Sequence, residues 1–95
     1  MLNGKQKRYL RALASKEKAV VQIGKDGLSY NIYDSLKKAL LARELVKVSI
    51  LKTCDEDVRE IAIDLSANTS SEIVQIIGRS IVLYKASKEH IITLP

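Results

Sequence analysis

Phenylalanine and tryptophan are absent from this sequence, and its aromatic residues are four tyrosines. The chain therefore lacks the aromatic strand platform on which RNA-recognition-motif proteins stack bases. It also contains a single cysteine, Cys54, and a single histidine, His90. A lone cysteine cannot form an intramolecular disulfide, and the spacings typical of a zinc site, Cys-x-x-Cys and His-x-x-His, are missing. We expect no disulfide, no metal and no cofactor.

Features that indicate a membrane protein or an enzyme are missing as well. No apolar run approaches the ~18 residues of a transmembrane helix, and there is no Walker A motif for nucleotide phosphates. Cys54 and His90 lack the third, orienting group that a nucleophile and its base need. We therefore expect a cytoplasmic protein that is a monomer, has no small-molecule substrate and is not an enzyme.

The composition and charge are those of one small basic domain. The chain has 95 residues, 46% of them hydrophobic and 28% charged, and a formal net charge of +5. Residues 1–52 contain twelve lysines and arginines against four acids, whereas residues 53–75 contain six acids and one arginine. Such a chain can present a basic face to a polyanion and an acidic face elsewhere. A merely solvated surface explains the charges equally well.

Hydrophobic periodicity and helix-start signals predict three helices and four strands. The helices are expected to begin at the capping residues Asn3, Ser29 and Thr53. Asp55–Asp57 would then occupy the first turn of the third helix, where negative charge suits the helix dipole. The connections between the first three strands are long enough for parallel crossovers, and the last two strands can only form a hairpin. The order predicts an α/β fold with one mixed four-stranded sheet, its strands over residues 19–23, 45–51, 72–77 and 80–85.

The most informative local pattern is Gly24-Lys25-Asp26-Gly27, between the first strand and the second helix. Two glycines let another backbone approach without a Cβ in the way, and the helix that follows leaves its first N–H groups free to meet an anion. Lys25 adds positive charge, whereas Asp26 opposes phosphate unless its side chain bonds to local backbone. The corner belongs to the basic half of the chain, and we expect the helix with Lys5, Lys7, Arg8 and Arg11 to neighbour it. The pattern resembles the Gly-x-x-Gly loop of KH modules, which holds about four nucleotides, but by itself it is more often a tight turn.

Four stretches together resemble the CRM domain (chloroplast RNA splicing and ribosome maturation) and, within that family, the stand-alone bacterial YhbY type. They are residues 2–11 (LNGKQKRYLR), 21–28 (VQIGKDGL), 42–48 (ARELVKV) and 74–84 (VQIIGRSIVLY). The resemblance covers nearly the whole chain, so we expect a CRM-type domain over residues 1–88 and a tail over residues 89–95. It implies a fold similar to the C-terminal domain of bacterial translation initiation factor three.

The resemblance also implies a function, which is binding of structured ribosomal RNA and assistance in assembly of the large ribosomal subunit. The family's Gly-x-x-Gly loop maps onto residues 24–27, and its basic surface includes the first helix. Arg79, on a hairpin turn, is a further candidate for phosphate contact. The RNA-binding residues that we predict are therefore Gly24, Lys25, Asp26, Gly27, Lys5, Lys7, Arg8, Arg11 and Arg79.

Several alternatives stay open at this point. Tyr30 could stack on a base beside the glycine corner, but we favour a half-buried tyrosine that covers the core. The protein could instead be an interaction adaptor that uses the acidic third helix or the apolar tail Ile91–Leu94. A small phosphate-handling enzyme at the glycine corner is the third hypothesis, against which stands the lack of a general base there.

Overall fold

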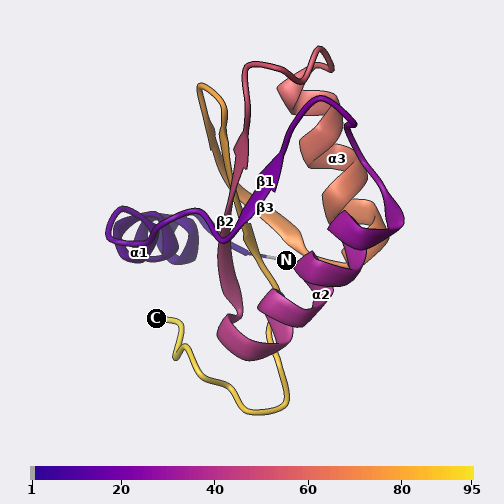
Figure 1. Cartoon of the computed structure of the whole chain (residues 1–95). Helices are drawn as coiled ribbons and strands as arrows, with labels where there is room; N and C mark the ends of the chain where they lie inside the picture. Colours follow the sequence, from indigo (N-terminus) through magenta and orange to yellow (C-terminus); the bar gives the residue numbers. More distant parts are fainter. Residues whose placement is uncertain (1) are drawn as a thin grey trace.

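The computed structural model describes residues 2–95 as three helices and four strands in the predicted order (Figure 1). The elements are α1 (Gly4–Ala14), β1 (Val21–Ile23), α2 (Tyr30–Arg43), β2 (Leu45–Ile50), α3 (Val58–Thr69), β3 (Glu72–Ile77) and β4 (Ser80–Tyr84). The strand order in the sheet is β1-β2-β4-β3. β1 and β2 are parallel, and β4 is antiparallel to both of its neighbours. The predicted α/β class and mixed four-stranded sheet are confirmed.

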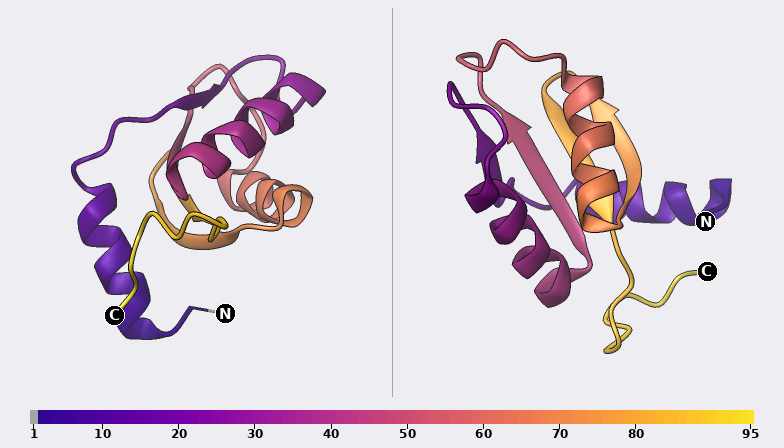
Figure 2. Two further views of the ribbon diagram at one scale, coloured as in Figure 1. Left: turned by 90° about the horizontal axis from the view of Figure 1, so that it is seen from below. Right: turned by 90° about the vertical axis from the view of Figure 1, so that its right-hand side faces the viewer.

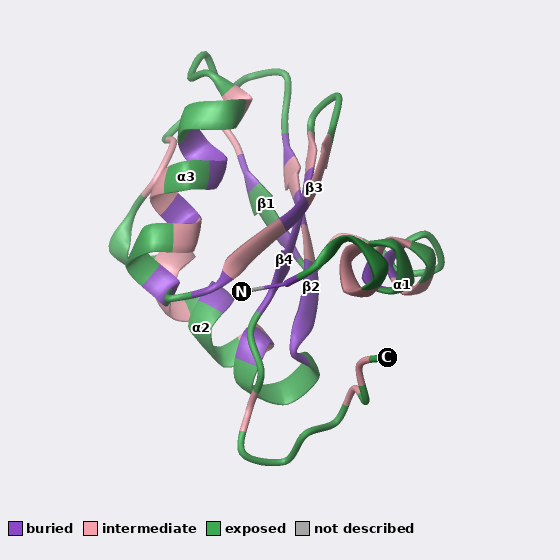
Figure 3. Ribbon diagram, turned by 180° about the vertical axis from the view of Figure 1, so that it is seen from behind, coloured by how far each residue is buried: buried purple, intermediate pink, exposed green. Residues whose placement is uncertain are grey.

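The sheet lies between two layers of helix (Figure 2). α2 and α3 cover one face, and α1 crosses the other face, where it contacts β2 and β3. Side chains alternate between the faces along each strand, so each layer has its own apolar core, and the sheet between them is largely buried (Figure 3). The core under α2 and α3 includes Ile23, Val48, Leu36, Leu65 and Leu83. The core under α1 includes Leu2, Leu10, Leu45, Val74 and Tyr84.

The helix starts follow the predicted capping residues in two of the three cases. Asn3 forms a complete capping box with Gln6 in α1, and Ser29 caps α2. The third prediction is wrong, because α3 begins at Val58 and its cap is Asp57, whose carboxylate accepts from the N–H of Arg59 over 2.9 Å. The preceding residues form a turn that buries Cys54, 4% exposed, before the helix can start.

Two helices end at residues with a positive φ. Ser70 follows α3 with a φ of 55°, and Glu44 follows α2 with a φ of 66°. Glycine is the residue that usually occupies such positions. Within residues 2–95, no helix is both long and apolar enough to cross a bilayer.

Candidate nucleic-acid interface

The glycine-rich loop over residues 24–27 leaves the carboxyl end of β1 and leads into α2 (Figure 1). Lys25 and Asp26 are exposed and the two glycines are half-buried, so solvent reaches the loop. The N–H of Gly27 donates to the carbonyl oxygen of Gly24 over 3.0 Å, and Gly27 has a φ of +66°, a left-handed conformation that favours glycine. The predicted sharp corner is present.

Both glycines are in contact with the chain's own β2–α3 connection. A Cβ on Gly24 would lie 3.3 Å from Cδ1 of Leu51 and 3.5 Å from the hydroxyl of Thr53. A Cβ on Gly27 would overlap the carboxylate oxygen Oε2 of Glu56. The missing Cβ atoms therefore allow two loops of the protein to pack together, a role that the sequence pattern did not reveal.

The first turn of α2 places peptide N–H groups beside this corner. The hydroxyl of Ser29 accepts from the N–H of Ile32. For the N–H groups of Tyr30 and Asn31 we find no acceptor among residues 2–95. These two donors are directed out of the N-terminus of a 14-residue helix, where an anion is favoured.

Tyr30 is 79% exposed, so the expectation that it covers the core is wrong. The face of α2 that packs on the sheet carries Ile32, Tyr33 and Leu36. Tyr30 is not among the residues of α2 that pack there, and its ring therefore lies in solvent. The ring is consequently free to stack on a base beside the glycine corner.

The end of the molecule that contains the glycine corner is not basic. Arg79 ties the hairpin turn to the β2–α3 connection, and that connection packs on the corner. Asp26 accepts no hydrogen bond from the residues that the structure describes, so its charge stays exposed to solvent. The segments that form this end, residues 24–27 and 51–57 with Arg79, contain three bases and four acids: Lys25, Lys52 and Arg79, with Asp26, Asp55, Glu56 and Asp57.

The predicted cations of the first helix lie on the opposite face of the sheet from α2 and α3 (Figures 1 and 2). The expectation that this helix neighbours the glycine corner is therefore wrong. The chain passes from α1 through residues 15–20 to the edge strand β1, and only then crosses to the other face. The four cations, of which Lys5 and Arg8 are exposed and Lys7 and Arg11 half-buried, come together on one helix that contains no acid.

Lys7 and Arg11 lie on the flank of α1 that is turned away from the C-terminal tail. The opposite flank holds the C-terminal tail, because the amide of Gln6 donates to the carbonyl oxygen of Pro95 over 3.3 Å and Leu13 lines a groove with Ile91 and Ile92. Lys7 is about 100° and Arg11 about 140° around the helix from Gln6.

That flank borders the part of the sheet that α1 leaves uncovered. Lys47 and Ser49 alternate with Val46, Val48 and Ile50 of the other core, so they face the α1 side. Gln22, which pairs with Ser49, is exposed there. A basic helix flank and a polar sheet surface thus adjoin, and we call this area the open sheet face.

Arg79 is held by main-chain oxygens. Its Nε donates to the carbonyl of Ile50 over 2.9 Å, and one terminal nitrogen donates to Leu51 over 2.6 Å and to Cys54 over 3.0 Å. The second terminal nitrogen makes no such bond within the described residues. Arg79 therefore fixes the β2–α3 connection, a role that the sequence did not predict, and keeps one nitrogen for an anion.

The tail over residues 89–95 is attached to the domain. Glu44 is fully buried, and its carboxylate accepts from the N–H of Ser87 over 2.7 Å, from the Ser87 hydroxyl over 2.6 Å and from the N–H of Ile92 over 2.8 Å. Ile92 and Leu94 pack against the core under α1. Burial acts to raise the pKa of Glu44, but the hydrogen bonds from Ser87 and the tail backbone hold it at about 2, against an ordinary value of 4.5.

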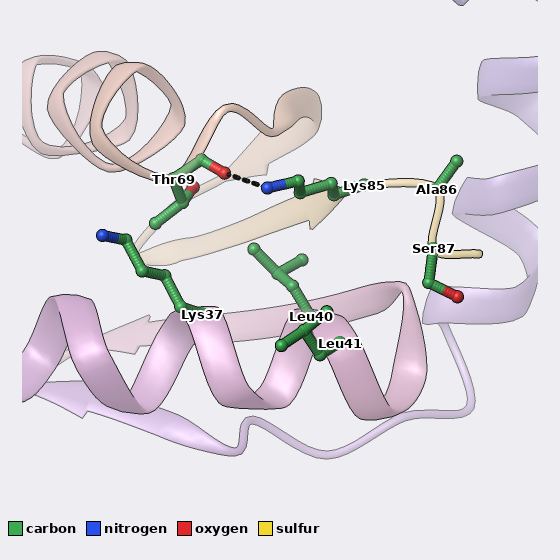
Figure 4. Close-up of a pocket in the computed structure, with 7 residues that line it drawn as sticks. All are labelled: Lys37, Leu40, Leu41, Thr69, Lys85, Ala86 and Ser87. Atoms are coloured by element: carbon green, nitrogen blue, oxygen red, sulfur yellow. Dashed lines mark hydrogen bonds between the residues drawn. The ribbon is translucent and has the colours of Figure 1, made fainter. Parts of the chain in front are cut away.

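The cavities lie away from the glycine corner. One of about 170 Å³ is enclosed by the ends of α2 and α3 and residues 85–87, with the Lys85 ammonium 3.1 Å from the carbonyl oxygen of Thr69 (Figure 4). Small-molecule sites occupy roughly 300–1,000 Å³, so this space is smaller than a typical ligand site, whereas the groove beside Leu13, Ile91 and Ile92 measures about 360 Å³. Among residues 2–95 no cluster of potential metal ligands is found.

Comparison with known proteins connects this arrangement to RNA-binding proteins. A model of the CRS1 / YhbY (CRM) domain matches residues 2–85. The chain is 48% identical over 90 residues to the "Probable RNA-binding protein YqeI" of Bacillus subtilis, covering 95% of this chain and 94% of that one. It is 35% identical over 95 residues to an RNA-binding protein of Haemophilus influenzae, covering 99% and 95%. The solution structure of a hypothetical Staphylococcus aureus protein, a proposed RNA-binding protein, matches over 100% of both chains at 48% identity with a TM-score of 0.85.

Proposed function

We propose, from the premise that this chain belongs to the CRS1 / YhbY (CRM) domain family, that it is a non-enzymatic RNA-binding protein. Its target in this proposal is structured ribosomal RNA, and its role is to assist assembly of the large ribosomal subunit. The names of its relatives support RNA as the partner. The ribosomal target follows from the family resemblance.

The observation that carries the proposal is the concentration of cations on α1. The helix contains four bases and no acid, and its capping box and buried Leu10 fix it against the sheet. Contacts between lysines or arginines and phosphates dominate the affinity of proteins for nucleic acids. Lys7 and Arg11 border the open sheet face, so a duplex groove edge or a folded backbone can contact the helix and the sheet together.

The glycine corner is the second contact in this proposal. Lys25, the free N–H groups of Tyr30 and Asn31, and the unused nitrogen of Arg79 would each meet phosphate. The corner and α1 are on different layers of the domain, so one RNA must bend or fold around β1 to reach both. This requirement favours structured RNA over a short single strand, in keeping with recognition by shape and backbone.

The salt dependence of RNA affinity tests this assignment. The double variant Lys25→Ala with Arg8→Ala removes one cation from each contact. We expect weaker binding to every RNA sequence and a salt slope that is flatter by ~0.7–0.9 for each phosphate that the variant no longer neutralises. The matched control is Lys37→Ala with Lys38→Ala, which removes the same charge from an exposed part of α2. If both double variants keep the slope of the parent protein, Lys25 and Arg8 do not bind phosphate.

The ribosomal part of the proposal needs a measurement in cells. Crosslinking of the protein to RNA, followed by sequencing of the attached RNA, should recover precursors of the large-subunit RNA. Recovery of other structured RNAs would leave RNA binding in place but contradict the assembly role. Absence of any RNA would favour a protein-interaction adaptor.

One observation favours the adaptor as the second candidate. Ile63, on α3, is 63% exposed beside the acidic side chain of Glu60, so this helix offers an apolar and acidic surface to a protein partner. The tail is less suited to that role, because Ile92 and Leu94 pack on the domain itself.

A further inference from the structure

We propose that Glu56 is a specificity-determining residue of the glycine corner, which weakens binding of any RNA that contacts the corner without also contacting α1. This inference rests on the proposed RNA-binding function. It concerns one acidic side chain in the corner that the family resemblance did not single out.

The position of Glu56 is the first observation. Its carboxylate lies against Gly27 so closely that a Cβ on that glycine would overlap Oε2. Gly27 is three residues before the first free N–H of α2, so the carboxylate lies close to the place where a phosphate would meet the helix N-terminus. A phosphate that enters there must either remain beside a negative charge or displace it.

The second observation is that Glu56 makes no structural bond. Within residues 2–95 its carboxylate has no hydrogen bond and no ion pair, and the residue is exposed. Two other acids of this region do have structural bonds. Asp57 caps α3, and Asp64 accepts a hydrogen bond from the hydroxyl of Tyr33 over 2.7 Å. Glu56 is therefore placed on the corner without serving the helix cap or the core.

The charge of Glu56 also reaches the first turns of α2. The pKa of Tyr33 is raised from 10.0 to about 12, chiefly by the hydrogen bond to Asp64, then by burial and the charge of Asp64, with a further contribution from Glu56. Tyr33 follows the free N–H groups of Tyr30 and Asn31 by less than one turn. The charge of Glu56 is therefore felt by a side chain of α2 on the side where this helix meets α3.

These observations divide the corner into two sides. Lys25 attracts phosphate on the exposed side, and Glu56 repels it on the side of the β2–α3 connection. Because Asp55 and Asp26 add further negative charge, the corner alone binds a polyanion weakly. RNA that also contacts the four cations of α1 gains enough attraction to offset this repulsion, and an unstructured strand that reaches only the corner does not.

The test compares Glu56→Gln with Glu60→Gln, using a 20-nucleotide single-stranded poly(U) and an RNA hairpin of similar length as probes, at about 0.1 M salt. Glu60 is also exposed and lies in the first turn of α3, but it does not touch the corner. We expect Glu56→Gln to bind poly(U) about three- to fivefold more tightly than the parent protein and the hairpin less than about twofold more tightly. Glu60→Gln should change either affinity by less than twofold, because Glu60 does not contact the corner and salt screens its charge.

A further variant shows that the gain comes from the corner. The double variant Glu56→Gln with Lys25→Ala should bind poly(U) no more tightly than the parent protein does. Thermal unfolding should be unchanged in Glu56→Gln, since the side chain makes no bond. Equal effects of Glu56→Gln and Glu60→Gln, or weaker binding by Glu56→Gln, would overturn the inference while leaving RNA binding intact. Failure of the parent protein to bind either RNA would instead overturn the proposed function itself.

Discussion

The carboxylate oxygen Oε2 of Glu44 accepts two hydrogen bonds from Ser87, one from its peptide N–H over 2.7 Å and one from its hydroxyl over 2.6 Å. Glu44 ends α2, and Ser87 lies just beyond β4. The same carboxylate accepts from Ile92. One buried charge thereby fixes the last residues of the chain across the end of α2 and onto the layer that contains the basic helix α1.

Replacing Glu44 by glutamine should destabilise the protein. The amide is neutral, and its NH₂ group would face donors instead of accepting from them. Hydrogen bonds to a charged group contribute about 1.5–3 kcal/mol each, so we expect the free energy of unfolding to fall by about 2–4 kcal/mol, measured by urea denaturation. Glu60→Gln, at an exposed position, is the control and should change it by less than about 0.5 kcal/mol. A loss equally small in Glu44→Gln would show that the tail is not held by this carboxylate.

The contribution of Glu44 should disappear in acid. Its pKa is lowered from 4.5 to about 2 in the folded protein, so the folded state binds this proton less readily than the unfolded state does. The stabilisation is complete above about pH 4.5 and is lost as the pH falls towards 2. Urea denaturation at several pH values should show the parent protein converging on Glu44→Gln over that interval. A gap between the two that stays constant down to about pH 2 would contradict the assignment.

Ser70 offers a stabilising substitution. It follows α3 with a φ of 55° and a ψ of 39°, a left-handed conformation that is unfavourable for a residue with a Cβ. Ser70→Gly should raise the free energy of unfolding by about 0.5–1 kcal/mol. Ser15, which ends α1, has a φ of −60°, and Ser15→Gly should lower it. If both variants change stability in the same direction, backbone conformation does not explain the effect.

Much of the fold could be predicted because its signals are local. The alternation of Val46, Val48 and Ile50 marks a strand, and the capping residues Asn3 and Ser29 mark two helix starts. Thr53 misled the prediction because it resembles a cap in sequence, whereas burial of Cys54 delays the start of α3 to Asp57 and Val58. Burial of a side chain in the core depends on distant residues and is not visible in a local pattern.

The candidate site was predictable in its parts but not in its arrangement. The glycine corner and the cations of α1 were found from sequence, yet the sheet separates them, since the strand order decides which face each helix covers. The contact of Glu56 with Gly27 and the three bonds of Arg79 join segments far apart in sequence. Glu44 is one of four acids in the basic half of the sequence, and no local pattern indicates that it is buried.

The two tyrosines of the first turns of α2 should respond differently to substitution. Tyr30→Ala should weaken RNA binding about fivefold or more, because stacking on one base contributes ~1–3 kcal/mol, and should leave stability nearly unchanged, since the ring is 79% exposed. Tyr33→Phe removes the bond to Asp64 and should lower stability by about 1 kcal/mol with little effect on RNA. Filter binding and urea denaturation on both variants check this. Equal RNA affinity in the parent and Tyr30→Ala would show that the exposed ring does not stack.

Arg79→Lys separates the two roles of the last predicted cation. Lysine keeps the positive charge but cannot bond the carbonyl oxygens of Ile50, Leu51 and Cys54 together, because it lacks the planar guanidinium with its fixed donors. We expect the free energy of unfolding to fall by about 1–3 kcal/mol, while the salt slope of RNA binding, measured well below the unfolding temperature, changes by less than the amount expected for one phosphate. Unchanged stability with a flatter slope would mean that Arg79 acts mainly on RNA, and that its bonds to the β2–α3 connection contribute little to the fold.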